Sequence, residues 1–175
     1  MWKWLALFSI CGLIGFAIYL YAHLGIREPV TITTGEVGPL LLIYKEHRGP
    51  YHQIAPVITE VEKWAITGNV PCAETFGEYL DDPQSVDEDR LRSNGGCVTE
   101  KKPDTLPEGF MFKELSRQKY VIAQFAGSPS IGPYKVYPQV QKYMDEQRLK
   151  MPLRTMEIYR VNGQQVLTEY LFEIQ

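Results

Sequence analysis

One order of elements occurs twice along this chain, and this repetition restricts the fold more than any other feature of the sequence. Residues 39–99 and residues 119–175 each have the pattern of a strand, a helix and two further strands. Residues 100–118, which contain Pro103 and Pro107, connect the two units. Two helices over one antiparallel sheet form an α+β domain, so the sequence predicts this fold class for residues 39–175.

The first unit opens with an apolar run, Pro39–His47, which turns polar at its end as a buried strand does. After the turn at Arg48–Tyr51, apolar residues recur with the spacing of an amphipathic helix. The residues with this spacing are Ile54, Val57, Ile58, Val61, Trp64 and Ala65. Two strands, Cys72–Leu80 and Arg92–Thr99, are predicted to follow the helix.

The second unit repeats these features at a constant distance. Its alternating strand, Lys119–Ala126, precedes a helix whose apolar stripe contains Tyr143, 79 residues after Trp64. Glu157 likewise stands 79 residues after Glu78. We therefore align the two units at this spacing and treat the two glutamates as equivalent positions.

The second unit ends in a predicted hairpin. Asn162-Gly163 is the strongest short signal for a β-hairpin and predicts that Leu153–Val161 pairs with Val166–Ile174. Side chains alternate between the two faces of a strand, so Glu157 and Tyr159 share the face opposite to the apolar residues beside them. This places a carboxylate and a phenol together on one side of the sheet.

The N-terminal run Trp4–Tyr21 has 18 residues and no charge, and as a helix it would span roughly 27 Å at about 1.5 Å per residue. A cleaved signal peptide and a buried core helix are the alternatives. No A-x-A cleavage site follows the run, and a domain of this size rarely buries a helix that is apolar all round. We expect an uncleaved membrane anchor in residues 1–24 and a tether in residues 25–38, so a chain that starts near Val37 should fold by itself.

The charges around this run give its expected orientation. Lys3 and the amino terminus precede the run, whereas Arg27 and the acidic Glu28 follow it. Positive charge tends to remain on the cytoplasmic side, so this small difference favours an extracytoplasmic domain. The sequence thus predicts a single-pass membrane protein, with the lipid bilayer as one partner and a membrane protein as a further candidate partner.

Composition argues against several classes of function. The net charge is −3, which is not the positive footprint of a nucleic-acid-binding protein, so we expect no nucleic acid partner. The three cysteines form no CxxC pair and no cluster with histidine at zinc spacing, so we expect no metal site and no cofactor. The chain has no Gly-rich phosphate loop, no HExxH motif and no Ser/His/Asp arrangement, and no catalytic residue is assigned.

Two of the cysteines, Cys72 and Cys97, fall on strands that we expect to pair. A disulfide between them would agree with an extracytoplasmic domain. Two separate buried thiols are the alternative. We favour the thiols slightly, because the sequence does not give the register of the two strands.

Five short segments of the chain occur in a recognisable order. They are Tyr79-Leu80-Asp81-Asp82-Pro83, Leu91-Arg92-Ser93, Gly127-Ser128-Pro129, Glu157-Ile158-Tyr159 and Thr168-Glu169. Together they resemble the GyrI-like small-molecule-binding domain, a family that includes effector-binding domains of bacterial transcription regulators and the DNA gyrase inhibitor. The resemblance covers residues 39–175 and implies two side-by-side units of the SHS2 type with a ligand cleft between them.

An N-terminal helix before such a domain also resembles the arrangement in the membrane-bound, testis-expressed receptor of endoplasmic-reticulum autophagy. The similar segments are Tyr44-Lys45, Gly49, Tyr137-Pro138 and Leu153–Tyr159. The resemblance stops short of the long acidic tail that carries the autophagy motif of that receptor. Phe112–Leu115 and Tyr51–Ile54 fit the aromatic-x-x-aliphatic pattern of such motifs, but both lie where we expect folded structure.

In the GyrI-like family the cleft takes organic, often cationic, ligands onto aromatic walls and a central glutamate. The resemblance places Glu157 at the position of this glutamate. A carboxylate in a partly apolar cleft attracts a cation, and each aromatic face adds roughly 0.5–2 kcal/mol of cation–π attraction. The candidate walls are Tyr159, Phe125, Tyr120, Tyr79 and Tyr44. The alternative is that Glu157 is exposed and that the aromatic side chains belong to an ordinary core.

The expected function is a membrane-tethered domain that binds a small organic ligand at Glu157 and performs no chemistry. One alternative is a protein-interaction module, either an accessory subunit of a membrane complex or a relative of the autophagy receptor, with the cleft filled by its own side chains. Another alternative is a hydrolase, since some family members resemble enzymes that open strained rings with a glutamate. Hydrolysis would require burial that raises the pKa of Glu157 and a water held against the carboxylate.

Overall fold

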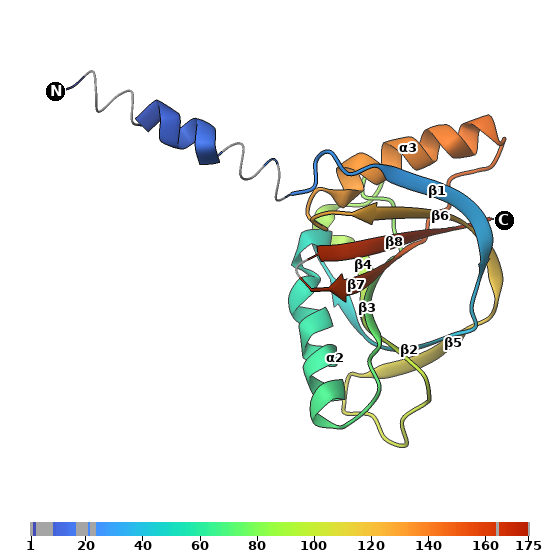
Figure 1. Cartoon of the computed structure of the whole chain (residues 1–175). Helices are drawn as coiled ribbons and strands as arrows, with labels where there is room; N and C mark the ends of the chain where they lie inside the picture. The colour runs from blue at the N-terminus through green and yellow to red at the C-terminus, as the bar shows by residue number, and fades with distance from the viewer. Residues whose placement is uncertain (1, 3–8, 17–20, 22–23, 164, 175) are drawn as a thin grey trace.

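The computed structural model describes residues 2, 9–16, 21, 24–163 and 165–174 (Figure 1). In this part of the chain eight strands form one antiparallel sheet, in the order β1-β6-β8-β7-β3-β4-β2-β5. The strands are β1 (Val30–Val37), β2 (Leu40–Arg48), β3 (Glu74–Tyr79), β4 (Arg92–Thr99), β5 (Met111–Leu115), β6 (Gln118–Ala126), β7 (Thr155–Asn162) and β8 (Gln165–Glu173). Two long helices, α2 (Ala55–Thr67) and α3 (Gly132–Glu146), lie on the outside of the strongly curved sheet (Figure 1). Short 3₁₀ helices occur at Tyr51–Gln53 and Glu88–Arg90.

Each helix packs the apolar stripe expected from its sequence against strands of its own unit. The buried members are Ile43, Val61, Ala65 and Cys97 for α2, and Val121, Ala123, Phe125, Val136, Val140, Met144, Tyr170 and Phe172 for α3. Full burial of one such large apolar side chain stabilises the fold by about 1.5–3 kcal/mol. Pro56 and Pro133 stand in the first turns of the helices, where a missing N–H costs no helical hydrogen bond.

The opposite face of the sheet, on the inside of its curve, carries a separate apolar core (Figure 1). Its buried members are Leu42, Phe76, Tyr120, Met156, Ile158 and Leu171. Both faces of the central strands are therefore buried, one by the helices and one by the curvature of the sheet itself. Any polar side chain on these strands has to find its partners inside the protein or in a ligand.

The two units correspond to one another at two slightly different spacings. In the helices the buried residues Val61 and Val140 occupy equivalent places 79 residues apart, as the sequence indicates. In the strands Tyr79 of β3 and Tyr159 of β7 face the same side and hydrogen-bond to each other, 80 residues apart. The alignment of Glu78 with the later glutamate is therefore wrong by one residue. A shift of one residue moves a strand side chain to the other face of the sheet.

The predicted tether and connector both contribute strands. Residues 25–38, expected as a tether, contain β1, which pairs along its whole length with β6. Residues 100–118, expected only as a connector, contain β5, which pairs with β2. The domain thus has eight strands where the repeat alone predicts six. The boundary between tether and domain at residue 39 is wrong, because β1 is part of the sheet.

The predicted membrane anchor is wrong for the described part of the chain. The predicted fold class, which included a transmembrane helix, and the single-pass localisation are wrong with it. Residues 9–16 form a helix, and no helix among the described residues is long and apolar enough to cross a membrane. Residues 4–8 and 17–20 of the predicted span lie outside the described residues. The predicted extracytoplasmic location of the domain depends on this span and has no basis without it.

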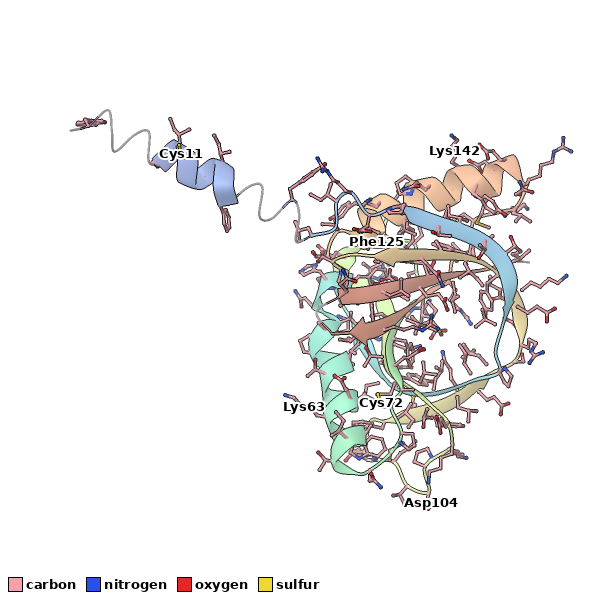
Figure 2. The ribbon with its side chains drawn as sticks, viewed as in Figure 1. Cys11, Lys63, Cys72, Asp104, Phe125 and Lys142 are labelled. Atoms are coloured by element: carbon pink, nitrogen blue, oxygen red, sulfur yellow. A yellow bond between two sulfur atoms is a disulfide. The ribbon has the colours of Figure 1, made fainter. Side chains whose placement is uncertain are left out.

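The two cysteines on neighbouring strands form a disulfide, so the preference for separate thiols is wrong. Cys97 of β4 lies opposite Thr75 of β3, and Cys72 precedes β3 by two residues. Their Cα atoms are 5.3 Å apart, within the usual range for a disulfide. Cys72 lies beside α2 (Figure 2), so this covalent link joins the loop after α2 to the sheet on which α2 packs.

Candidate functional site

A carboxylate and three tyrosines meet on the helix-covered face of the sheet, where the two units join. Strand β7 pairs with β3 so that Glu157 lies opposite Gly77. Tyr159 lies two residues along β7 and Tyr79 two residues along β3, on the same face. Tyr137 reaches this place from the first half of α3. We call Glu157, Tyr159, Tyr79 and Tyr137 the carboxylate–tyrosine cluster.

Hydrogen bonds connect the members of this cluster. The Tyr159 hydroxyl donates to Oε2 of Glu157 at 3.0 Å, and the Tyr137 hydroxyl donates to Oε1 at 3.5 Å. The hydroxyls of Tyr79 and Tyr159 lie 3.0 Å apart and hydrogen-bond to each other. The carboxylate is thus held by two tyrosines of the second unit, and Tyr79 of the first unit joins the network through Tyr159.

Two glycines make room for the cluster beside Glu157. A side chain on Gly77 would meet the hydroxyls of Tyr79 and Tyr159, since a Cβ there would lie 3.0 Å and 3.4 Å from them. Gly95, the next residue across on β4, receives Ile58 of α2, whose Cγ1 would lie 2.8 Å from a Cβ. In the row of residues across the sheet, Glu157 therefore has Gly77 and then Gly95 on one side and Tyr170 on the other.

Burial controls the electrostatics of the cluster. Glu157 is 3% exposed, and this burial raises its pKa to about 7, although the hydrogen bonds from Tyr159 and Tyr137 oppose the shift. Among the described residues no lysine or arginine pairs with this carboxylate. Burial and the nearby Glu157 also raise the pKa values of the three tyrosines, which therefore stay protonated and act as hydrogen-bond donors.

Three buried hydroxyl groups next to the cluster have no hydrogen-bond partner. In the part of the chain that the structure describes, the buried side-chain oxygens without a partner are those of Ser93, Thr168 and Tyr170. Each belongs to a residue paired with a cluster strand: Tyr170 opposite Glu157, Thr168 opposite Tyr159, and Ser93 opposite Tyr79. The unsatisfied polar groups therefore surround the same site.

The structure divides the residues proposed from the sequence between the two faces of the sheet. Glu157, Tyr159 and Tyr79 meet in the cluster. Phe125 lies on the same face but packs in the core beneath the first turn of α3 (Figure 2). The exposed position considered for Glu157 does not occur.

Tyr120 and Tyr44 lie on the opposite face, so their assignment as walls of this site is wrong. Both pack with the inner core of the sheet, because each strand residue directs its side chain to the face opposite to that of its neighbours. Tyr44 lies beside Lys113, whose ammonium is 5.0 Å from the centre of the ring. Lys113 forms an ion pair with the buried Glu78, which also accepts a hydrogen bond from Asn94 at 2.6 Å. Glu78 is thus a paired structural carboxylate.

Sequence reasoning missed two aromatic members of the site, Tyr137 and Tyr170. Tyr137 stands next to Val136 on the apolar stripe of α3, which marks it as facing the sheet but not as facing Glu157. Tyr170 lies opposite Glu157 in β8. A two-residue turn centred on Asn162-Gly163 would instead pair Glu157 with Thr168, but in the structure Asn162 itself pairs with Gln165, so the turn motif predicts the hairpin and not this register.

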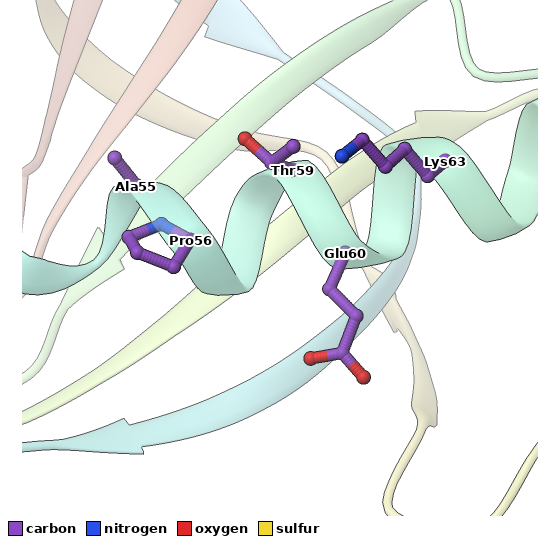
Figure 3. Close-up of a pocket in the computed structure, with 5 residues that line it drawn as sticks. All are labelled: Ala55, Pro56, Thr59, Glu60 and Lys63. Carbon is purple, nitrogen blue, oxygen red and sulfur yellow. The ribbon is translucent and has the colours of Figure 1, made fainter.

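The hollows on the surface of the described structure lie elsewhere. One, lined by Ala55, Pro56, Thr59, Glu60 and Lys63, is a shallow depression on α2 (Figure 3). Another is lined by Arg148, Leu149, Lys150 and Ile174. Glu157 is 3% exposed and is covered by its hydrogen-bond partners Tyr159 and Tyr137, which are themselves partly exposed. Within the described ranges, no group of three histidine, cysteine, aspartate or glutamate residues could hold a metal ion.

Several solved structures share this fold. The C-terminal domain of EcmrR has a TM-score of 0.67 and 10% identity, covering 83% of this chain and 98% of that chain. SAV2435 bound to tetraphenylphosphonium has a TM-score of 0.58 and 10% identity, covering 83% and 94%. A hydrolase from Listeria innocua has a TM-score of 0.53 and 12% identity, covering 83% and 92%. At these identities the likeness shows the fold alone.

The remaining comparisons concern sequence. No curated protein matches this chain. The comparisons give no support to the resemblance to the autophagy receptor. The profile of the GyrI-like small molecule binding domain matches residues 31–175, which include seven of the eight strands completely and nearly all of β1. The chain belongs to the GyrI-like small molecule binding domain family.

Proposed function

We propose that this domain binds a small organic cation at Glu157 and does so without catalysing a reaction. The observation that carries this proposal is a buried carboxylate without a positive partner among the described residues. Burying an unpaired carboxylate is costly, and proteins that retain one either protonate it or supply a counter-charge. A cationic ligand provides the charge that the protein itself does not.

The surroundings of Glu157 suit an organic cation better than an inorganic one. Tyr159, Tyr137 and Tyr79 present aromatic rings as well as hydroxyls, and a ring face attracts a cation by roughly 0.5–2 kcal/mol. An inorganic divalent ion would instead require several oxygen ligands with charge. The combination of one carboxylate with several tyrosines therefore favours an ammonium or a similar organic cation.

One relative offers independent support by analogy. SAV2435, which shares the fold, has been solved bound to tetraphenylphosphonium, an organic cation. That binding is a property of SAV2435, and the identity between the two chains is 10%. It makes tetraphenylphosphonium a reasonable first probe for this protein.

Binding requires the cluster to open, since its own side chains fill the site. The first half of α3, which carries Tyr137, is the part of the enclosure with weak helix-forming sequence. It starts with Gly132 and Pro133, and Pro138 lacks the N–H that would bond to the preceding turn. We therefore expect ligand entry to displace Tyr137 rather than the tyrosines on the central strands.

The test is a binding measurement by calorimetry on the chain 24–175, with tetraphenylphosphonium and choline as probes. In Glu157→Gln the amide keeps the shape and removes the charge, so binding should weaken by roughly 1–3 kcal/mol. The matched control is Glu36→Gln, which removes one carboxylate from an exposed position on β1. Equal binding by the Glu157 variant and the wild type would refute the proposal.

A protein-interaction module is the second candidate, and the filled site favours it. If neither probe binds, the cluster is a closed core, and the domain acts through its surface. The raised pKa of Glu157 meets one requirement of the hydrolase alternative. Each carboxylate oxygen already accepts a tyrosine hydroxyl, however, so no position for an attacking water is evident, and we assign no catalysis.

A further inference from the structure

The hydroxyl of Tyr170 is buried next to the site and satisfies nothing within the described protein. Tyr170 is 0% exposed and lies directly opposite Glu157 in the β7–β8 pair. Thr168, two residues away on the same face, is also 0% exposed. The two hydroxyls lie close enough for Thr168 to lower the pKa of Tyr170 against the larger effect of burial, but neither reaches a partner with hydrogen-bond geometry. A buried hydroxyl without a partner is destabilising, and most buried polar groups in proteins are paired.

The fold makes specific room for the Tyr170 hydroxyl. Gly132 opens α3 directly above it, and a Cβ at this position would lie 1.9 Å from the hydroxyl oxygen. At the equivalent place in the first unit the arrangement is reversed, since Gly95 in the sheet receives Ile54 and Ile58 from α2. In the second unit the glycine is therefore in the helix, where it lets the start of α3 come close to the Tyr170 hydroxyl. A phenylalanine at residue 170 would fill the apolar space without this cost.

The third unpaired oxygen extends the pattern to the other side of the cluster. Ser93 is 1% exposed and lies opposite Tyr79 in the β3–β4 pair. All of the unpaired buried hydroxyls found in the described part of the chain thus adjoin the carboxylate–tyrosine cluster. Hydroxyl groups can donate and accept, so they match a ligand that carries a polar group of its own.

We infer that the ligand of this site is a small ammonium compound that also carries a hydroxyl or carbonyl group, with Glu157 facing the charge and Tyr170 and Thr168 bonding the polar group. This inference rests on the proposed function and narrows it. A site with buried groups intended for hydrogen bonding rejects an analogue that leaves them unpaired. The domain should therefore prefer a hydroxylated ammonium to a cation of the same size without a hydroxyl.

The test compares two cations that differ in one group, choline and propyltrimethylammonium, by calorimetry on the full chain. The second replaces the choline hydroxyl by a methyl group and keeps the fixed charge. The wild type should bind choline about tenfold more tightly, the value of one good hydrogen bond in a buried site. In Tyr170→Phe this preference should disappear, while the affinity for propyltrimethylammonium stays the same.

Thermal unfolding of the same variant provides a second readout with the opposite sign. Tyr170→Phe removes an unpaired buried hydroxyl, so the ligand-free variant should have a higher Tm than the wild type. The matched control is Tyr134→Phe, which removes a hydroxyl from a tyrosine that is 83% exposed on the same helix end. The control should change neither the Tm nor the preference for choline.

The outcomes separate this inference from the proposed function. Equal binding of the two cations by the wild type, or a preference that survives Tyr170→Phe, overturns the inference. A lower Tm for Tyr170→Phe also overturns it, since the hydroxyl would then be satisfied within the fold. Glu157-dependent binding of tetraphenylphosphonium without binding of choline overturns the inference but leaves the proposed function in place. Absence of binding by all three cations overturns both.

Discussion

At the scale of single residues, the burial of Glu157 decides how the protein responds to pH. The residue directly across from Glu157 in the first unit is Gly77, so only the second unit supplies a carboxylate at this place on the helix-covered face. Charge on a buried carboxylate is costly, and the fold tolerates Glu157 by protonating it more readily than an exposed glutamate. The ligand-free protein therefore has a stability that depends on this one proton.

The first prediction concerns this pH dependence. The pKa of Glu157 is raised from 4.5 to about 7 in the folded state, so the folded protein holds this proton more tightly than the unfolded chain. Stability from this group is fully present below about pH 4.5 and is lost as the pH rises through 7. The loss should amount to roughly 3 kcal/mol, at about 1.4 kcal/mol for each pKa unit.

Urea unfolding between pH 5 and pH 8 measures this effect. Glu157→Gln should be more stable than the wild type at pH 8 and should lose most of the wild-type slope between these values. Glu36→Gln, at an exposed position, should keep the slope. A wild-type stability that rises from pH 5 to pH 8 would show that Glu157 is ionised in the fold at low pH.

The sequence predicted some of these residues and not others, for definite reasons. Strand alternation correctly put Glu157 and Tyr159 on one face, because the rule is local. The same rule, applied to each strand separately, could not tell whether Tyr44 and Tyr120 share a face with Glu157. The spacing of 79 residues failed for Glu78 because the segment between α3 and β7 is longer than the segment between α2 and β3, so equivalent strand positions are 80 residues apart. A spacing between helices does not show where such an insertion lies.

At the scale of elements, the segment before the first repeat is part of the domain. Val30 and Ile32 of β1 pack against the core beneath α3. Lys135 of α3 also holds the chain just before this strand, since its ammonium donates to the carbonyl oxygens of Ile26 at 2.7 Å and Glu28 at 2.5 Å. Residues 24–37 are thus fixed to the sheet and to α3. A tether and a strand both contain short polar and β-branched residues, which is why the composition of residues 25–38 did not distinguish them.

The second prediction follows from this placement. A chain that starts at Val37 lacks β1 and exposes one edge of β6, so it should be less stable than a chain that starts at Leu24 and should aggregate more readily. Loss of the Val30 and Ile32 side chains alone removes burial worth a few kcal/mol. Urea unfolding and light scattering of the two chains provide the comparison.

A control for length separates this effect from truncation in general. A chain that starts at Val30 keeps β1 but loses the contacts of Lys135, and its stability should lie between those of the other two. Equal stability of the chains that start at Val37 and Leu24 would mean that β1 adds nothing to the domain.

At the scale of the whole molecule, the two outermost strands of the sheet come from segments outside the repeated units. β1 precedes the first unit in the chain but pairs with β6 of the second, and β5 follows the first unit and pairs back onto its β2. The units also meet directly where β3 pairs with β7. Neither half can therefore complete its part of the sheet without chain from the other side of the repeat, although the repeat itself suggests two separable modules.

The last prediction is that the chain 24–175 unfolds in one cooperative transition. Trp64 is the only tryptophan between residues 24 and 175. It lies on α2 and packs against Phe110, with the two ring centroids 5.1 Å apart, so its fluorescence reports the first unit. The slowly exchanging amides expected in β8 report the second unit, whose strand is buried on both faces. Because β1, β5 and the β3–β7 pair join the units, both probes should give the same urea midpoint within error.

Fragments 24–99 and 100–175 should each remain unfolded alone, since the first lacks β6 and β7 and the second lacks β1, β2 and β3. Separate midpoints for Trp64 and β8, or a folded fragment, would show that the repeat consists of two independent modules.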